Sequence, residues 1–213
     1  MTEEEAKAWL TNALHVSRET YERLEAFVAM VIAEGRLQNL ISAATIPHIW
    51  ARHIVDSAQL LTLLTTEEEE QQGPWLDLGT GAGFPGIVLA LLSDTPITFV
   101  ESRKRRIEFL ADVCEQLSLA HVTLYGGALE KLPTAPFSVI TARAFAPLPK
   151  LLSVAHRFST RRTVWLLPKG ARAREEIEGV KEAWRGVFHV EQSITDPAGQ
   201  IIIGRTLAPK GRP

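Results

Sequence analysis

From Pro74 onward, short apolar runs alternate with longer amphipathic stretches, and this alternation constrains the fold more than any other feature. The runs have the length of strands, and the stretches show helical spacing. Strands are predicted at Trp75–Leu78, Ile97–Glu101, His121–Tyr125, Ser138–Ala142 and Thr163–Leu167, and helices at Pro85–Leu92, Arg103–Leu117, Pro147–Phe158 and Ala171–Trp184. The pattern is typical of βαβ units and predicts an α/β fold with a doubly wound parallel sheet.

The end of the chain departs from this alternation. Two strand-like runs, Val187–Ile194 and Gln200–Thr206, are separated by a turn of hairpin length with no room for a crossover helix. The sheet is therefore predicted to end in an antiparallel pair. Seven strands arranged in this way resemble the Rossmann-like sheet of methyltransferases, whereas dinucleotide-binding domains usually continue in parallel.

The first seventy residues predict helices. Ser17 can cap an amphipathic helix that stops at Gly35, and a second helical segment runs from Thr45, with Pro47 in its first turn, to Leu64. The polar run Thr65–Gly73 is a candidate boundary. We expect an N-terminal helical extension (1–72) packed on the core, a main domain (73–207) and a flexible tail (208–213).

Composition excludes several classes of protein. The chain has no run of 18 apolar residues, and its N-terminus is acidic, so neither a membrane span nor a signal peptide is predicted. Its single cysteine forms no internal disulfide, and no Cys/His cluster has zinc spacing. We expect a cytoplasmic protein without a metal site, membrane association or an obligate protein partner.

Charge is distributed unevenly. Residues 1–100 carry five Lys/Arg and fourteen Asp/Glu, a net charge of −9, whereas residues 101–213 carry eighteen and eleven, a net charge of +7. This asymmetry fits a C-terminal part that binds a polyanion, and it equally fits a gradient along surface helices.

The strongest motif lies between the first predicted strand and helix: Asp77-Leu78-Gly79-Thr80-Gly81-Ala82-Gly83-Phe84-Pro85-Gly86. Open α/β sheets bind ligands at this carboxyl edge, and glycines there allow sharp turns and close approach. The spacing Gly81-x-Gly83-x-x-Gly86 matches the dinucleotide fingerprint, with Glu101 placed as a ribose-binding acid. The spacing Asp77-x-Gly79-x-Gly81-x-Gly83 is that of S-adenosylmethionine (SAM) methyltransferases.

Two local features and the antiparallel end favour SAM. The Asp77 carboxylate suits the ammonium and sulfonium groups of SAM but would repel a pyrophosphate. Pro85 removes an N–H donor that a pyrophosphate would use. Asp77, Gly79, Gly81 and Gly83 are thus candidate cofactor residues. Glu101, at the end of the second strand, can accept bonds from both ribose hydroxyls; alternatively it caps the following helix.

Residues near the transferred methyl are expected after the fourth strand, in Arg143-Ala144-Phe145-Ala146-Pro147. The Asn/Asp-Pro-Pro-aromatic motif of amine methylation is absent there, and Cys114 lies inside a predicted helix, which argues against cytosine-C5 chemistry. A substrate atom with a free lone pair, such as guanine N7, fits this segment. Positioning alone would then suffice, without a general base.

Several motifs together resemble the RsmG (GidB, glucose-inhibited division protein B) family. They are Asn39-Leu40-Ile41-Ser42, Arg52-His53-Ile54-Val55-Asp56-Ser57, the Asp77–Gly86 turn, Arg143-Ala144 and Leu167-Pro168-Lys169-Gly170. The resemblance implies SAM-dependent methylation of guanine N7 in the decoding-region loop of 16S rRNA, with S-adenosylhomocysteine as product. It also implies cofactor contacts at Gly79, Phe84, Leu129, Glu130 and Arg143, with Arg143 holding the methionine carboxylate.

The substrate would be 16S rRNA or the small ribosomal subunit, so cations that could meet phosphates are of interest. Lys169 follows the fifth strand at the cofactor edge and, with Arg143, is a positioning candidate; further candidates for RNA binding are Arg103, Arg172 and Arg174. His53 and Asp56 lie three residues apart on one helical face, where they could pair and brace the cofactor turn. Two alternatives remain: an NAD(P)-linked oxidoreductase and a non-catalytic RNA-binding module.

Overall fold

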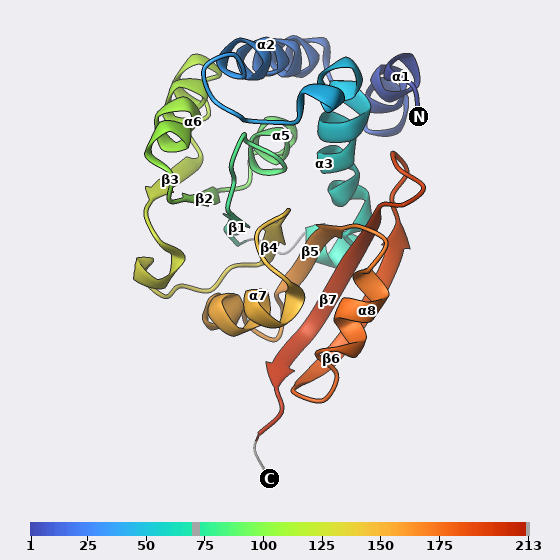
Figure 1. Cartoon of the computed structure of the whole chain (residues 1–213), viewed down its shortest axis with the longest axis vertical. Helices are drawn as coiled ribbons and strands as arrows, with labels where there is room; N and C mark the ends of the chain where they lie inside the picture. Colours follow the sequence, from blue (N-terminus) through green and yellow to red (C-terminus); the bar gives the residue numbers. More distant parts are fainter. Residues whose placement is uncertain (70–72, 212–213) are drawn as a thin grey trace.

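In a computed structural model, which describes residues 1–69 and 73–211, the sheet has seven strands in the order β3-β2-β1-β4-β5-β7-β6 (Figure 1). The strands are β1 (Trp75–Leu78), β2 (Ile97–Glu101), β3 (Val122–Gly126), β4 (Val139–Ala142), β5 (Val164–Lys169), β6 (Trp184–Gln192) and β7 (Gln200–Pro209). The first five are mutually parallel, while β7 pairs antiparallel with both β5 and β6. This is the predicted α/β fold with its antiparallel end.

The order in which the strands are added to the sheet changes side at β1: β2 and β3 lie on one side of it, and β4 and β5 lie on the other. Trp75 is in register with Ile97 of β2 on one side and with Val139 of β4 on the other. The loops that leave β1 and β4 therefore diverge from neighbouring strand ends. Open α/β sheets bind their ligands at such a switch point.

Helices cover both faces of the sheet (Figure 1). One face is covered by α5 (Gly86–Leu92) and α6 (Lys104–Gln116), on which α2 (Arg18–Glu34) packs as an outer layer, and α1 (Glu3–Ala13) belongs to the same core; the other face packs against α7 (Leu148–Ala155), η5 (His156–Phe158) and α8 (Ala173–Glu178). Side chains alternate along β1: Trp75 belongs to the first core, and Leu76 and Leu78 belong to the second. The N-terminal helices and the sheet thus share one continuous core. Within the described residues, no helix combines the length and apolar character needed to cross a bilayer.

The second predicted helix, Thr45–Leu64, is a series of short helices of different pitch: η1 (Ala43–His48), a π-helix η2 (Trp50–Val55), α3 (Asp56–Ala58) and η3 (Gln59–Leu63). Pro47 cannot donate within η1. At the start of η2, the carboxylate of Glu3 accepts bonds from the backbone N–H groups of Trp50 and Ala51, at 3.0 Å each. A side chain from α1, which was not predicted, therefore caps the wide turn.

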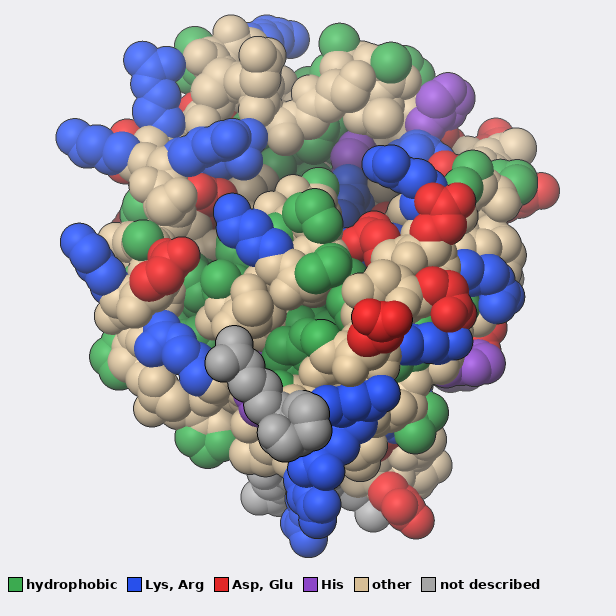
Figure 2. All heavy atoms as spheres, turned by 60° about the horizontal axis from the view of Figure 1, so that its bottom comes forward, with side chains coloured by type: hydrophobic (Ala, Val, Ile, Leu, Met, Phe, Trp, Pro, Cys, Tyr) green, Lys and Arg blue, Asp and Glu red, His purple; other side chains and the backbone are tan. Residues whose placement is uncertain are grey.

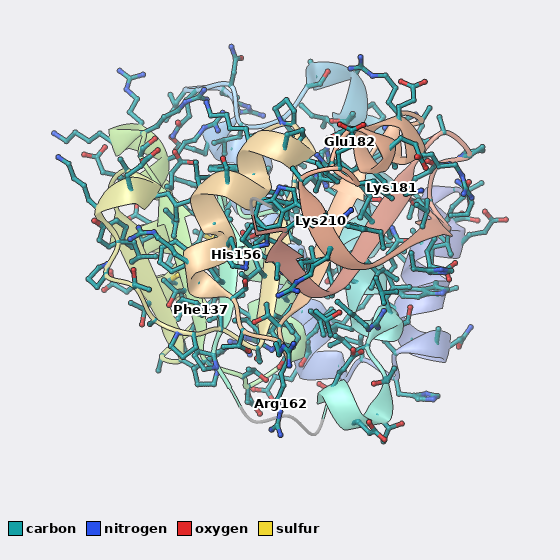
Figure 3. The ribbon with its side chains drawn as sticks, turned by 90° about the horizontal axis from the view of Figure 1, so that it is seen from below. Phe137, His156, Arg162, Lys181, Glu182 and Lys210 are labelled. Carbon is teal, nitrogen blue, oxygen red and sulfur yellow. The ribbon has the colours of Figure 1, made fainter. Side chains whose placement is uncertain are left out.

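The C-terminal boundaries also differ from the prediction. The last helix ends at Glu178, and Trp184 begins β6, where it packs edge-on against His156 with ring centroids 5.2 Å apart. Strand β7 reaches Pro209, so the first residues of the predicted tail are in the sheet. Lys210 then donates to the carbonyl of Lys181; Figure 3 labels both residues near this end of β7.

The acidic connector contains a short helix, α4 (Thr66–Glu69), and residues 70–72 of it lie outside the described residues. Glu68 forms an ion pair with Arg205 of β7, with Nε 2.5 Å from Oε1. The described part of the connector is therefore tied to the sheet. The remaining helical and strand boundaries agree with the prediction to within about two residues.

Phe27 of α2 tests how far the extension supports the fold. Its fully buried ring packs against Phe84 of the glycine-rich turn, with centroids 5.2 Å apart. Phe27→Ala is expected to lower the free energy of unfolding by about 3–5 kcal/mol, the usual cost of emptying a buried aromatic site. Urea denaturation measures this, with Leu37→Ala (72% exposed) as control. A loss as small as the control's would show that the extension is only loosely attached.

Candidate active site

The turn after β1 has a backbone conformation that requires glycine, and at Gly79 and Gly83 it also leaves no room for a side chain. Gly79, Gly81 and Gly83 have φ angles of 67°, 61° and 96°, which side chains rarely adopt. A Cβ at Gly79 would lie 2.7 Å from the Phe145 ring, and one at Gly83 would lie 2.8 Å from Phe27. The glycines therefore have two roles: they allow the backbone to turn at the edge of the sheet, and they leave space in which neighbouring side chains pack.

A cavity of about 350 Å³ opens at the carboxyl edge of β1, β2 and β3. It brings together five of the residues predicted for cofactor or RNA binding: Gly79, Glu101, Arg103, Leu129 and Glu130. Leu129 and Glu130 belong to η4 (Leu129–Lys131). The backbone at Gly79 and Gly127, the carboxylate of Glu101 and the apolar Leu129 together suit an adenosine.

Glu101 holds the end of β2 against the glycine turn. Its side chain is buried; Oε2 accepts from the N–H of Gly81 at 3.0 Å, and Oε1 accepts from those of Ser102 and Arg103 at 2.8 and 2.9 Å. The carboxylate thus makes the alternative capping contacts while also facing the cavity. Oε1 uses both of its lone pairs in these bonds, whereas Oε2 has a further lone pair for a ribose hydroxyl.

Other candidate cofactor residues lie behind the cavity wall. Gly81 and Gly83 are buried in the turn and do not line the cavity. Phe84 is also buried, between Phe27 and His53, with the guanidinium of Arg143 5.7 Å from its ring centroid. In this structure these residues contact protein, and their predicted contacts with the cofactor stay predictions.

Asp77 is completely buried beneath the turn. Its Oδ1 accepts from the hydroxyl of Thr141 on β4 at 2.7 Å, and its Oδ2 has no hydrogen-bond partner among the residues that the structure describes. Burial raises the pKa of Asp77 to about 6, against the opposite effect of the Thr141 hydrogen bond. The carboxylate lies under the turn rather than on the cavity surface, so its predicted contact with SAM also stays a prediction.

A second and larger cavity, of about 910 Å³, adjoins the first; we call it the groove. Its walls come from η1, η2, the segment after β4, the end of β5, α8 and the β6–β7 turn. Arg143, Lys169 and Arg172 line it, whereas Arg174 is exposed outside it. On the face shown in Figure 2, acids and bases are mixed on the right, while Lys and Arg predominate at the upper left.

Arg143 is held by residues of the extension. Its Nη1 lies 3.2 Å from Oδ2 of Asp56, and its Nη2 lies 2.5 Å from Nδ1 of His53. Nε2 of His53 is 2.9 Å from the hydroxyl of Thr45, which itself donates to the carbonyl of Ser42. Together these contacts define a neutral His53 that accepts from Arg143 and donates to Thr45.

Burial, reinforced by the charges of Arg143 and Arg52, lowers the pKa of His53 to about 3. His53 and Asp56 were predicted to pair with each other; instead each of them binds Arg143. The predicted bracing of the turn is present, because the His53 ring packs on Phe84 with centroids 4.8 Å apart.

Lys169 forms an internal ion pair. Its side chain is 12% exposed, and Nζ lies 2.8 Å from Oε2 of Glu176 and 3.1 Å from the carbonyl of Ala146. The same Glu176 oxygen accepts from the N–H of Leu148 at 2.6 Å. Lys169 thus holds the segment after β4, as a positioning residue would, and its charge is compensated within the protein.

Sequence reasoning missed several residues of the site. Glu176 was not singled out, and Thr45 was predicted only as the start of a helical segment. Arg52, although part of a quoted motif, was given no role; it forms an ion pair with Asp196 beside the groove. Arg106 was also given no role; it reaches over Gly81 and donates to the carbonyl of Asn39 at 3.3 Å. The basic run at Arg103–Arg106 was the available signal.

The mixed seven-stranded sheet and the glycine-rich cavity at its switch point define a SAM-dependent methyltransferase. Cofactor-bound Rv0187 from MTB has the same fold, with a TM-score of 0.63 and 15% identity over 92% of this chain and 93% of that chain. The glycopeptide N-methyltransferase MtfA in complex with SAM gives a TM-score of 0.59 and 10% identity, over 72% of this chain and 94% of that chain.

Comparison of amino-acid sequences identifies the family to which this chain belongs. Residues 20–200 match the family described as rRNA small subunit methyltransferase G. Ribosomal RNA small subunit methyltransferase G of Novosphingobium aromaticivorans is 51% identical over 99% of this chain and 91% of its own length. The enzyme of the same name from Zymomonas mobilis is 48% identical over 99% and 96%. This chain belongs to the rRNA small subunit methyltransferase G family, as its motifs indicated.

The raised pKa of Asp77 predicts a stability difference that depends on pH. The folded protein binds the proton on Asp77 more tightly than the unfolded chain does. The resulting contribution to the free energy of unfolding is fully present below about pH 4 and is lost as the pH rises through about 6. The neutral Asp77→Asn variant should therefore be more stable than the wild type by about 2–3 kcal/mol at pH 8, and about equally stable at pH 4.

Urea unfolding at the two pH values measures this difference. Asp94→Asn, which removes the same charge from an exposed position, serves as control. An Asp77→Asn advantage that is equal at pH 4 and pH 8 would contradict the burial of an ionised carboxylate.

The lowered pKa of His53 predicts the opposite pH dependence. The contribution of neutral His53 to the free energy of unfolding is present above the pKa of about 6.5 that histidine has in the unfolded chain. It is lost as the pH falls toward 3, because the unfolded chain binds the proton more readily. His53→Gln keeps an acceptor for Arg143 but does not titrate. Relative to this variant, the wild type should lose about 2 kcal/mol between pH 7 and pH 5.

Thermal or urea unfolding across that range measures the loss, and His48→Gln, at an exposed position, is the matched control. Parallel pH profiles for the wild type and His53→Gln would show that His53 is not held neutral in the folded protein.

Proposed function

We propose that this methyltransferase transfers the SAM methyl group to N7 of a guanosine in 16S rRNA. The observation that supports this choice is the boundary between the cofactor cavity and the groove. Ala144, Phe145 and Ala146 line both cavities, and none of them carries a side chain that accepts a proton. A substrate atom with a free lone pair, such as guanine N7, needs no such acceptor.

SAM supplies an electrophilic methyl on its sulfonium. The protein's task is then to hold donor and acceptor in line, since proximity and orientation can contribute much of the rate enhancement. Glu101 would bind the ribose hydroxyls, and Leu129 and Glu130 would border the adenine. Arg143, fixed by Asp56 and His53 beside Ala144, would meet a methionine carboxylate that extends from the cofactor cavity toward the groove.

The structure offers little support for the dinucleotide alternative. Gly83 is the glycine of the fingerprint at which the backbone would approach a pyrophosphate. Here a Cβ at Gly83 would lie 2.7 Å from Ile87 and 2.8 Å from Phe27, so protein side chains fill the space that the pyrophosphate would need.

For RNA binding we propose the exposed cations Arg103, Arg172 and Arg174, and we assign Lys169 to positioning. Arg103 borders the cofactor cavity and Arg172 borders the groove. They could contact phosphates on either side of a base placed between them. Because the proposed substrate is 16S rRNA or the small ribosomal subunit, we propose the cytoplasm as the compartment; the proposal requires no protein partner.

The test uses small ribosomal subunits, and separately 16S rRNA, prepared from cells that lack this modification. Incubation with methyl-labelled SAM should label one guanine at N7, located by mapping the labelled nucleotide. Asp77→Ala and Arg143→Ala should reduce turnover at least tenfold, in line with the loss of a positioned charged contact. Calorimetry should show binding of S-adenosylhomocysteine and not of NAD(P).

Comparison of the two substrates identifies the form that is methylated. Label on an atom other than guanine N7 would overturn the specificity, and binding of S-adenosylhomocysteine without any label would favour the non-catalytic alternative. Unchanged turnover in both variants would contradict the site assignment.

A further inference from the structure

Phe145 is an unusual side chain for the position that it occupies. It is one of the few large hydrophobic residues with substantial exposure, 36%, and it lies at the boundary shared by the cofactor cavity and the groove. Among the described residues its ring takes part in no recorded aromatic pair. A ring face is therefore left without an aromatic partner where the two cavities meet.

The backbone that carries Phe145 is held firmly on both sides. Ala144, just before it, has a φ of 53°, a conformation that non-glycine residues adopt rarely. After it, Lys169 binds the carbonyl of Ala146, and Glu176 binds the N–H of Leu148. These contacts fix where the aromatic side chain begins.

The ring itself rests on the glycine turn. A Cβ at Gly79 would come within 2.7 Å of Cδ2 of Phe145, so the absence of a side chain at Gly79 allows the ring to lie there. On the groove side, Pro147, Pro149 and Pro168 add apolar surface. An aromatic ring over the cofactor edge, with proline side chains beside it in the groove, is suited to a flat, unpaired base.

We propose that Phe145 is the stacking platform for the target guanine and positions its N7 toward the cofactor cavity. The inference rests on the proposed function, because it assigns a residue to the same reaction. RNA is recognised largely through unstacked bases that lie on aromatic side chains, and enzymes that modify a base place it in a fitted pocket. The ring binds the base, while Ala144 and Ala146 leave the passage open for the methyl group.

The test separates stacking on the RNA from contact with the cofactor. Base–aromatic stacking lost on truncation commonly lowers affinity by about 10- to 100-fold. Phe145→Ala should therefore lower kcat/KM for the rRNA substrate about 10- to 100-fold at saturating SAM, while S-adenosylhomocysteine affinity changes less than about threefold. Phe145→Trp should retain most of the activity, and Phe145→Leu, which is apolar but not aromatic, should resemble Phe145→Ala.

Val187→Ala, a truncation at a 59% exposed position on β6, is the control for removing surface hydrophobicity. Thermal unfolding of each variant verifies that it folds. Equal activity of Phe145→Leu and wild type, or a loss of S-adenosylhomocysteine affinity as large as the loss in kcat/KM, would overturn the stacking role. If wild-type protein gives no N7 label, the proposed function fails instead, and the two failures are thus distinguishable.

Discussion

The site depends on how closely the turn after β1 is packed. Phe145 lies above Gly79, Phe27 and Ile87 press against Gly83, and Asp77 lies beneath Gly86. Each of these approaches uses space that a Cβ would occupy. The turn therefore holds its shape through contacts on all sides, and the cofactor cavity and the groove are both defined by it.

The N-terminal helices are part of this arrangement as well as a cover for the sheet. Glu3 caps the π-helix, which presents His53 at the groove, and Asp56 follows directly after it. His53 and Asp56 then orient Arg143 from the end of β4. One wall of the groove thus comes from a segment outside the βαβ succession, which explains why the family motif Arg52–Ser57 lies so far from the glycine turn in sequence.

The order of strands and helices could be predicted because hydrophobic periodicity is local. The spacing of apolar residues within each run indicates whether it forms a strand or a helix and which of its faces is buried. The carboxyl-edge location of Glu101 followed from that order, whereas Leu129 and Glu130 were implied by the family resemblance. The π-helix could not be predicted in the same way, because it depends on a carboxylate from α1 that is distant in sequence. The depth of Asp77 and the internal pairing of Lys169 with Glu176 were also beyond reach, since position along a strand or helix does not reveal which side chains close over it.

The pairing of cations beside the groove has a consequence for how RNA would associate. Arg52, Arg143 and Lys169 each have a carboxylate partner within the protein, whereas Arg103, Arg172 and Arg174 form no recorded ion pair among the described residues. A cation already neutralised in this way displaces few of the counterions condensed on a nucleic acid. The dependence of association on ionic strength should thus arise from the rim of the site, while its interior distinguishes bases with little sensitivity to salt.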